Sequence, residues 1–198
     1  MGEKAVAAAK AVNYSGAGTI EFLVDKHRNF YFLEMNTRLQ VEHPITEEVC
    51  GVDLVKEQIR VANDEVLHLK QEDLLQRGHA IECRICAEDT ENNFLPSPGI
   101  IKQLTEPNGI GVRIDSYVYE GYEIPIYYDP MIGKLIVWAT TRQYAIERMR
   151  RVLYEYKITG LKTNLSYLKR IMHTPDFVKG EYNLSLIHIS EPTRLDVI

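Results

Sequence analysis

Two glutamates occupy mirror-image positions in a predicted β-hairpin, and this arrangement constrains the fold more than any other feature. Two runs rich in β-branched and aromatic residues, 19–24 and 30–35, flank a short polar segment. This pattern is typical of two antiparallel strands joined by a loop. Pairing that is symmetric about the loop sets Glu21 opposite Glu34 and Val24 opposite Tyr31.

The facing glutamates indicate a bound cation. Like charges opposite each other destabilise a β-ladder, and a carboxylate within an apolar strand is costly unless something compensates it. A hard divalent cation is the natural compensator, because Mg²⁺ is typically held by one or two carboxylates plus the phosphates of a nucleotide. The sequence therefore predicts that Glu21 and Glu34 bind Mg²⁺ (or Mn²⁺).

A polar row continues beyond the second of these strands. In an extended chain alternate residues share a face, and here one face is polar while the other is apolar. Glu and Asn are poor strand formers, which favours a functional row over a solvated outer face. The row offers metal ligands, an anion-binding guanidinium and a possible base. Its members are Glu34, Asn36, Arg38, Gln40 and Glu42.

These residues resemble a known family. The segment 34–44, Glu-Met-Asn-Thr-Arg-Leu-Gln-Val-Glu-His-Pro, and the preceding segment 16–22 look like the ATP-grasp core of biotin carboxylases. Those subunits or domains carboxylate biotin in acetyl-, propionyl- and methylcrotonyl-CoA carboxylases and in pyruvate carboxylase. The resemblance covers nearly all of residues 2–183. It includes the segments 51–58, 77–84, 94–99 and 127–135.

The resemblance implies that ATP phosphorylates bicarbonate to carboxyphosphate, which releases CO₂ to a ureido nitrogen of biotin on a partner protein. It assigns Glu21, Glu34 and Asn36 to the Mg²⁺ (or Mn²⁺) ions that bridge the phosphates. Leu23 contributes to ATP binding together with the two glutamates. Leu184 stands where the family places a further apolar contact with adenine.

The resemblance also assigns the bicarbonate site and the catalytic groups. Arg38, Gln40 and the backbone of Val41 hold bicarbonate, for which a planar guanidinium is well shaped. Glu42 is the general base that deprotonates bicarbonate. Arg84 stabilises the enolate-like oxygen of deprotonated biotin, as a fixed positive charge aimed where negative charge develops.

The implied fold class is α+β, in two domains. Residues 1–76 form the C-terminal half of an ATP-grasp domain, an antiparallel sheet with helices, and residues 77–183 form the biotin carboxylase C-terminal domain, a β-sheet plus helices. Residues 184–198 look like a translated sequencing adapter and are expected to be a non-native tail. Because the family's N-terminal domain, lid and phosphate loop have no counterpart here, we expect a C-terminal fragment that is inactive alone.

Local patterns place the remaining elements. An Ala-rich helix is expected over 4–14, and helical spacing over 46–61 has a break near Gly51 with Asp53 as an N-cap. An apolar stripe predicts a helix over 143–156, capped by Thr140 or Thr141 and ended by Gly160. Further strands are expected at 79–87, 99–106, 111–119 and 134–139, and a further helix at 164–172.

Composition limits which partners and which cellular compartment are compatible with this chain. The net charge of -5, without a basic stripe, argues against nucleic acid, and no apolar run has membrane-spanning length. Cys83 and Cys86 form a Cys-x-x-Cys pair inside a predicted strand, which favours a structural, reduced role in the cytoplasm. The family implies a biotin carboxyl carrier protein or domain, a carboxyltransferase, and a homodimer contact near 110–113.

Two alternatives remain open. Another ATP-grasp ligase, such as a carbamoyl-phosphate or carboxylate–amine ligase, shares the paired carboxylates but should lack the segment 40–43 and the segment around Arg84. The second alternative is a noncatalytic module for dimerisation or for docking of a biotin carrier, a role that a fragment without the family's front half could still perform. We expect the parent to serve an acetyl-CoA or related acyl-CoA carboxylase, although a transferase outside this sequence decides between acyl-CoA and pyruvate.

Overall fold

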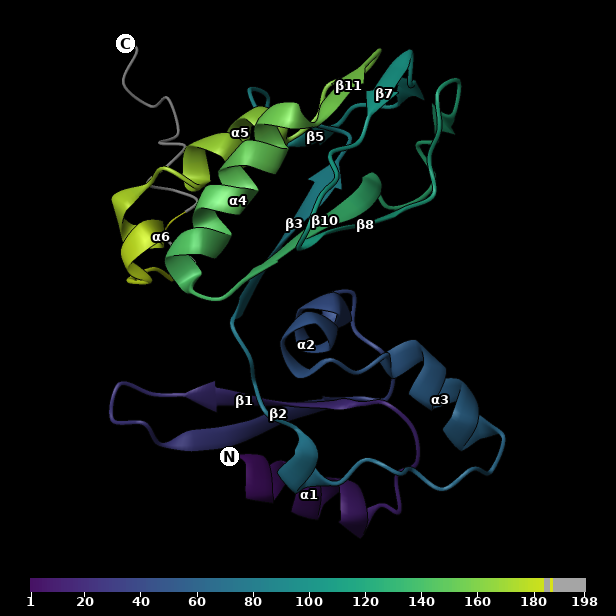
Figure 1. Cartoon of the computed structure of the whole chain (residues 1–198), viewed down its shortest axis with the longest axis vertical. Coiled ribbons are helices and arrows are strands. Elements are labelled where there is room, and N and C mark those ends of the chain that lie inside the picture. Colours follow the sequence, from purple (N-terminus) through teal and green to yellow (C-terminus); the bar gives the residue numbers. More distant parts are fainter. Residues whose placement is uncertain (184–185, 187–198) are drawn as a thin grey trace. The chain divides into compact units, whose positions relative to one another are not determined.

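The computed structural model describes residues 1–183 and Leu186, and the chain divides into two compact units, one of residues 1–76 and one that begins at Arg77 (Figure 1). Every strand ladder described is antiparallel, and helices accompany the sheets in both units. The expected α+β class is confirmed. The adenine contact expected at Leu184 and the tail expected from that residue onward lie outside the described residues, apart from Leu186.

The first unit consists of a hairpin and short helices. Its helix α2 begins at His43, ahead of the expected start, because Pro44 suits the first turn of a helix. Gly51, with φ of 70°, ends α2 in the left-handed conformation, and the Asp53 side chain caps α3 by accepting from the Lys56 amide at 2.8 Å. The elements are α1 (Gly2–Ala11), β1 (Thr19–Val24), β2 (Phe30–Asn36), α2 (His43–Cys50), α3 (Leu54–Ala62) and a 3₁₀ turn (Gln71–Asp73).

The hairpin register agrees with the symmetric prediction at one end only. Glu21 pairs with Glu34 as expected, but Val24 pairs with Phe30 rather than with Tyr31. The register shifts between the two ends, where Leu33 is the extra residue of a β-bulge. The loop is one residue shorter than the symmetric prediction requires, and the bulge adds one residue to β2. The two glutamates therefore still face each other.

The polar row does not continue as a strand, and this part of the prediction was wrong. Strand β2 ends at Asn36, the chain bends near Arg38, and Glu42 is the residue that precedes helix α2. The amide of His43 already donates to the Gln40 carbonyl at 3.1 Å, so the turn toward the helix begins there. Arg38, Gln40 and Glu42 therefore do not share one strand face with Glu34.

The second unit is built on the three-stranded sheet β3–β10–β8, with β10 in the centre. Helix α4 packs on one face of this sheet, and α5 and α6 lie beside it (Figure 1). The Thr141 hydroxyl caps α4 by accepting from the Tyr144 amide at 3.2 Å. The sheet strands are β3 (His79–Cys86), β10 (Met131–Ala139) and β8 (Val112–Ser116), and the helices are α4 (Arg142–Glu155), α5 (Leu165–Ile171) and α6 (Pro175–Lys179).

Two predictions in this unit were wrong in detail. The strand expected over 99–106 is split in two, and helix α4 ends at Glu155, ahead of Gly160. Residues 157–159, between α4 and Gly160, form β11, which pairs with β7. The short ladders pair β4 (Glu88–Asp89) with β5 (Leu95–Pro96), β6 (Gly99–Ile100) with β9 (Glu123–Ile124), and β7 (Gln103–Thr105) with β11 (Lys157–Thr159).

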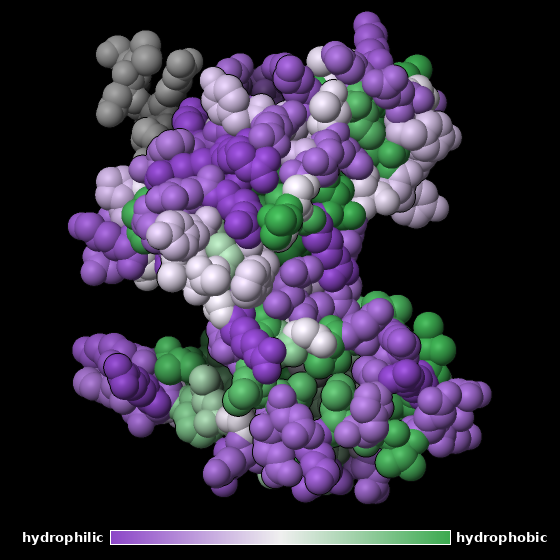
Figure 2. Space-filling view, in the orientation of Figure 1, coloured by the Kyte–Doolittle hydropathy of each residue, from purple (hydrophilic) through white to green (hydrophobic). Residues whose placement is uncertain are grey.

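The surface of the first unit carries many hydrophobic side chains (Figure 2). On the hairpin they stand on both strands, with Leu23 58% and Phe32 60% exposed. In the second unit the apolar side chains of α4 and of the three-stranded sheet form one buried cluster instead. Among the described residues, no helix combines the length and the apolar character needed to cross a bilayer.

Candidate active site

Four side chains that the sequence singled out converge at the hairpin. Oε1 of Glu21 accepts hydrogen bonds from Nδ2 of Asn36 at 2.8 Å and from Nε2 of Gln40 at 3.1 Å. The same Asn36 nitrogen lies 3.2 Å from Oε1 of Glu34. One amide nitrogen therefore bridges carboxylate oxygens from both strands.

The strand pairing explains this convergence. Glu21 and Glu34 are direct partners, and Asn36 pairs with Thr19, so these side chains belong to two successive rungs on one face of the hairpin. Diagonal neighbours across a ladder lie within reach of long side chains, which brings Asn36 to Glu21. Gln40 reaches the same carboxylate from the link that follows β2.

The residues at this cluster fit a divalent cation. Two carboxylates and the amide oxygen of Asn36 are hard oxygen ligands of the kind that Mg²⁺ prefers, and Glu34 is exposed. In the described part of the chain no group of three or more His, Cys, Asp or Glu gathers around one point. The cluster thus offers fewer ligands than an octahedral ion needs, so phosphates and water would have to complete the shell.

The other expected residues of the first unit lie next to this cluster in the chain. Leu23 follows Glu21 by two positions on β1, and its side chain is largely exposed. Arg38 is exposed, and its Nη1 donates to the Leu39 carbonyl at 3.3 Å. Val41 is half-buried and Glu42 is exposed, both on the link between β2 and α2.

Arg84 belongs to the second unit, where it stands on strand β3. Its side chain is 50% exposed, and its Nε lies 3.8 Å from Oε1 of Glu82 on the same strand. The side chain of Glu82, in contrast, is 6% exposed. The two residues therefore form an ion pair in which the Glu82 side chain is buried and the Arg84 side chain is half exposed.

Asn164, immediately before α5, is a site residue that sequence reasoning missed. This buried side chain donates to the Arg84 carbonyl at 3.0 Å and accepts from the Cys86 amide at 2.9 Å. It thereby fixes the backbone on the C-terminal side of Arg84, across Ile85. The available signal was an Asn at a helix start, which indicates a cap, yet this side chain makes no capping bond to its own helix.

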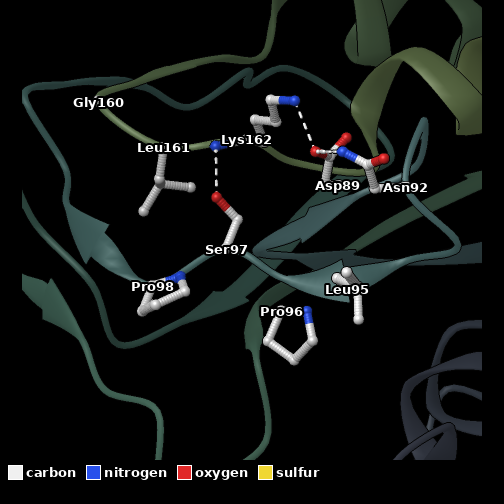
Figure 3. Close-up of a pocket in the computed structure, with 9 residues that line it drawn as sticks. All are labelled: Asp89, Asn92, Leu95, Pro96, Ser97, Pro98, Gly160, Leu161 and Lys162. Atoms are coloured by element: carbon white, nitrogen blue, oxygen red, sulfur yellow. Dashed lines mark hydrogen bonds and ion pairs between the residues drawn. The ribbon is translucent and has the colours of Figure 1, made fainter.

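A separate open hollow of about 620 Å³ in the second unit contains none of the expected site residues (Figure 3). Nζ of Lys162 lies 2.5 Å from Oδ2 of Asp89, which also accepts from Asn92 at 2.9 Å. The hydrogen bonds from Lys162 and Asn92 hold the pKa of Asp89 below its usual value. The charged groups of this hollow thus compensate each other.

Comparison with known families identifies both parts of the chain. Residues 82–188 match the family model described as biotin carboxylase C-terminal domain. Residues 1–70 match the model described as carbamoyl-phosphate synthase L chain, ATP binding domain. The second match places the carboxylate cluster within an ATP-binding domain, and the first covers more than half of the chain.

Curated relatives and solved structures agree with these matches. The chain is 57% identical over 187 residues to the biotin carboxylase of Nostoc sp., covering 94% of this chain and 42% of the relative. It is 56% identical over 187 residues to a pyruvate carboxylase subunit of Methanothermobacter thermautotrophicus, covering 94% of this chain and 38% of that relative. The chain thus spans about two fifths of the length of these relatives.

A solved structure of similar fold contains ligands. It is the biotin carboxylase domain dimer of the Hydrogenobacter thermophilus 2-oxoglutarate carboxylase, in complex with MgADP, ADP and bicarbonate. The TM-score is 0.91 and the identity 47%, and the match covers 94% of this chain and 42% of that one. Together with the family matches, this shows that the chain belongs to the biotin carboxylase family.

Proposed function

We propose that this chain carries the divalent-cation, bicarbonate and biotin sites of an ATP-dependent biotin carboxylase. The observation that supports this most directly is the convergence of Glu21, Glu34 and Asn36 at one face of the hairpin. The similar structure with MgADP and bicarbonate contains a nucleotide, a metal and a one-carbon substrate that suit such a cluster.

The residues of the first unit bind the nucleotide phosphates and bicarbonate. Glu21, Glu34 and Asn36 hold the divalent ion, which when bound neutralises charge on the phosphates. Leu23 contributes an apolar contact to ATP. Bicarbonate is held by hydrogen bonds to its oxygens from a guanidinium, a side-chain amide and a peptide group, which belong to Arg38, Gln40 and Val41.

Glu42 and Arg84 carry out the proton transfer and the charge stabilisation. Glu42 takes the proton of bicarbonate, whose oxygen then attacks the γ-phosphorus of ATP and displaces ADP. The resulting carboxyphosphate breaks into CO₂ and phosphate. The phosphate that is released takes the ureido proton of biotin, the deprotonated nitrogen attacks CO₂, and Arg84 stabilises the negative oxygen of the deprotonated ring.

The same proposal covers the partners. Biotin is presented on a carrier protein or domain, and a carboxyltransferase passes the carboxyl group to an acetyl-CoA or related acyl-CoA acceptor, although the matched pyruvate carboxylase subunit keeps pyruvate open. The three cysteines are free thiols, which supports a reducing compartment such as the cytoplasm.

The activity is tested in a chimera in which this chain replaces the aligned segment of the Nostoc biotin carboxylase. We expect ADP release that depends on bicarbonate and on biotin, and a loss of at least about a hundredfold on Glu34→Gln. Glu3→Gln, on the exposed surface of α1, is the matched control and should leave the rate unchanged. A folded chimera without biotin-dependent ADP release would contradict the proposal.

A second candidate function is dimerisation or carrier docking without catalysis. It is favoured by exposed apolar side chains on the second unit, since Ile110 is 92% exposed and Tyr127 and Tyr128 are each 82% exposed. Sedimentation of the chain alone tests dimerisation, and Ile110→Asp should then abolish the dimer. Biotin-dependent ATP cleavage by the chain alone would refute a purely noncatalytic role.

A further inference from the structure

The three-stranded sheet of the second unit has one apolar face and one charged face. Ile81, Cys83, Leu135 and Val137 belong to the buried cluster that includes the side chains of α4. Because side chains alternate along a strand, the residues between them point to the opposite face. These are Glu82 and Arg84 on β3, Lys134 and Ile136 on β10, and Arg113 and Asp115 on β8.

The register arranges this charged face in two rungs. One rung runs Asp115, Lys134, Arg84, and the next runs Arg113, Ile136, Glu82. Lys134 and Arg84 are therefore direct neighbours across β10 and β3, although both carry a positive charge. Like charges in this position destabilise a sheet unless each has its own compensation.

The charge of Lys134 is compensated from β8. Nζ of Lys134 lies 3.3 Å from Oδ2 of Asp115, and its side chain is only 11% exposed. Arg113 holds the same carboxylate with two hydrogen bonds, of 2.7 and 2.9 Å. Burial raises the pKa of Asp115, but the hydrogen bonds and charges of Arg113 and Lys134 outweigh it and lower the pKa overall. The ammonium of Lys134 is thus held toward β8.

The charge of Arg84 is compensated along its own strand. Glu82 is two residues earlier on the same face, and its Oε1 lies 3.8 Å from Nε of Arg84. The buried carboxylate of Glu82 approaches the guanidinium from the Nε side, while Lys134 repels it from the neighbouring strand. The attraction by Glu82 and the repulsion by Lys134 together restrict where the long Arg84 side chain can place its charge.

We infer that Glu82 is a positioning residue for Arg84: its carboxylate attracts the guanidinium at Nε, and so directs the charge toward the substrate oxygen. This inference rests on the proposed role of Arg84. Glu82 is assigned no contact of its own with biotin or bicarbonate. Its effect on the reaction passes through Arg84, and therefore reaches the biotin step but not the phosphorylation of bicarbonate.

The experiment uses the chimera with the Nostoc enzyme and the isosteric variant Glu82→Gln. We expect biotin-dependent ADP release to fall at least about tenfold. Bicarbonate-dependent ADP release without biotin should stay within about twofold, because it uses residues of the first unit. Arg84→Lys should reduce the biotin-dependent rate as well, and the double variant should be no slower than Arg84→Lys, since Glu82 acts through Arg84. Glu123→Gln, an exposed residue of β9, is the control.

Two results in the chimera would overturn the inference. One is an equal loss of both ADP-releasing reactions in Glu82→Gln, and the other is a double variant whose loss is the product of the single losses. Hydrogen exchange of the Arg84 Nε–H, followed by ¹⁵N NMR in the present chain, gives a readout that is independent of activity. We expect Glu82→Gln to accelerate it at least about fivefold, because a nearby carboxylate charge repels the hydroxide that catalyses exchange, and an unchanged rate would also overturn the inference. A wild-type chimera without biotin dependence would instead count against the proposed function. The exchange rate would still test whether Glu82 interacts with the Arg84 guanidinium.

Discussion

Glu21 lies directly opposite Glu34 in the β1–β2 ladder, and the Asn36 amide nitrogen lies within hydrogen-bonding distance of both carboxylates. A rung with two facing acids is unfavourable unless protons or cations stand between them. The amide supplies such donors in this structure. A divalent ion that binds here would require the amide to turn, so that its oxygen faces the metal.

This relationship predicts a measurable cation affinity. We expect Mn²⁺, followed by water proton relaxation in the wild-type chain, to bind at least about tenfold more tightly than in Glu21→Gln or Glu34→Gln, because each variant removes one anionic ligand. Asn36→Ala should weaken binding by less, since it removes a neutral ligand. Glu3→Gln on α1 is the control for a general loss of negative charge. Equal Mn²⁺ affinity in all four variants would show that the cluster is not the cation site.

The hairpin could be predicted from sequence because its two strands are local and rich in β-branched and aromatic residues. The pairing of Glu21 with Glu34 was right and that of Val24 with Tyr31 was wrong for one reason. Pairing residues symmetrically about the loop ignores a β-bulge. The bulge at Leu33 shifts the register by one residue, so the symmetric pairing holds for Glu21 and Glu34 but not for the residues nearer the loop. Strand alternation beyond Asn36 failed because the turn into the helix at His43 interrupts it.

The surroundings of Arg84 could not be predicted in the same way, because they depend on contacts between residues far apart in the chain. Asn164 is eighty positions from Arg84, and Lys134 faces it only through the register of β10. Periodicity shows that a strand exists but not which strand lies beside it. The same limit explains β11, which forms because β7 provides a partner before Gly160 is reached.

The role of Asn164 predicts a large loss of stability on substitution. Asn164→Ala leaves the Arg84 carbonyl and the Cys86 amide without these partners, at a cost of about 2–4 kcal/mol in the free energy of unfolding. Urea denaturation followed by circular dichroism measures it. Asn108→Ala, at an exposed position, should change stability by less than about 0.5 kcal/mol. A similar small change for Asn164→Ala would mean that the side chain does not anchor β3.

The cysteines are expected to be unreactive in the folded protein. Burial, together with nearby acidic side chains, raises the pKa of Cys83 and of Cys86 to about 12. At pH 8 a thiol of this pKa is a thiolate in about one molecule in 10⁴, and only the thiolate reacts with iodoacetamide. Mass spectrometry should find both residues unlabelled when the same residues in urea are fully labelled. Rapid labelling, or a disulfide between them, would contradict the structural role.

His79 predicts how stability depends on pH. Burial first, and the nearby Arg142 charge second, lower the pKa of His79 below its usual 6.5. Its Nε2 lies 3.2 Å from Nη1 of Arg142, and because a guanidinium only donates, this nitrogen must be the unprotonated acceptor. The same Arg142 donates to the Phe177 carbonyl at 2.5 Å and stacks on that ring, so the neutral imidazole helps to hold α4 and α6 together.

The sign of the effect follows from the lowered pKa. As the pH falls below about 6.5, His79 gains a proton in the unfolded chain but not in the folded one, so the free energy of unfolding decreases until the pH passes the folded pKa. Gln at this position can accept from Arg142 and does not titrate. We therefore expect His79→Gln to match the wild type in urea denaturation at pH 7 and to lose less stability between pH 7 and pH 5. His173→Gln, at an exposed position, should keep the wild-type slope, and an unchanged slope in His79→Gln would show that the imidazole is not held neutral by this contact.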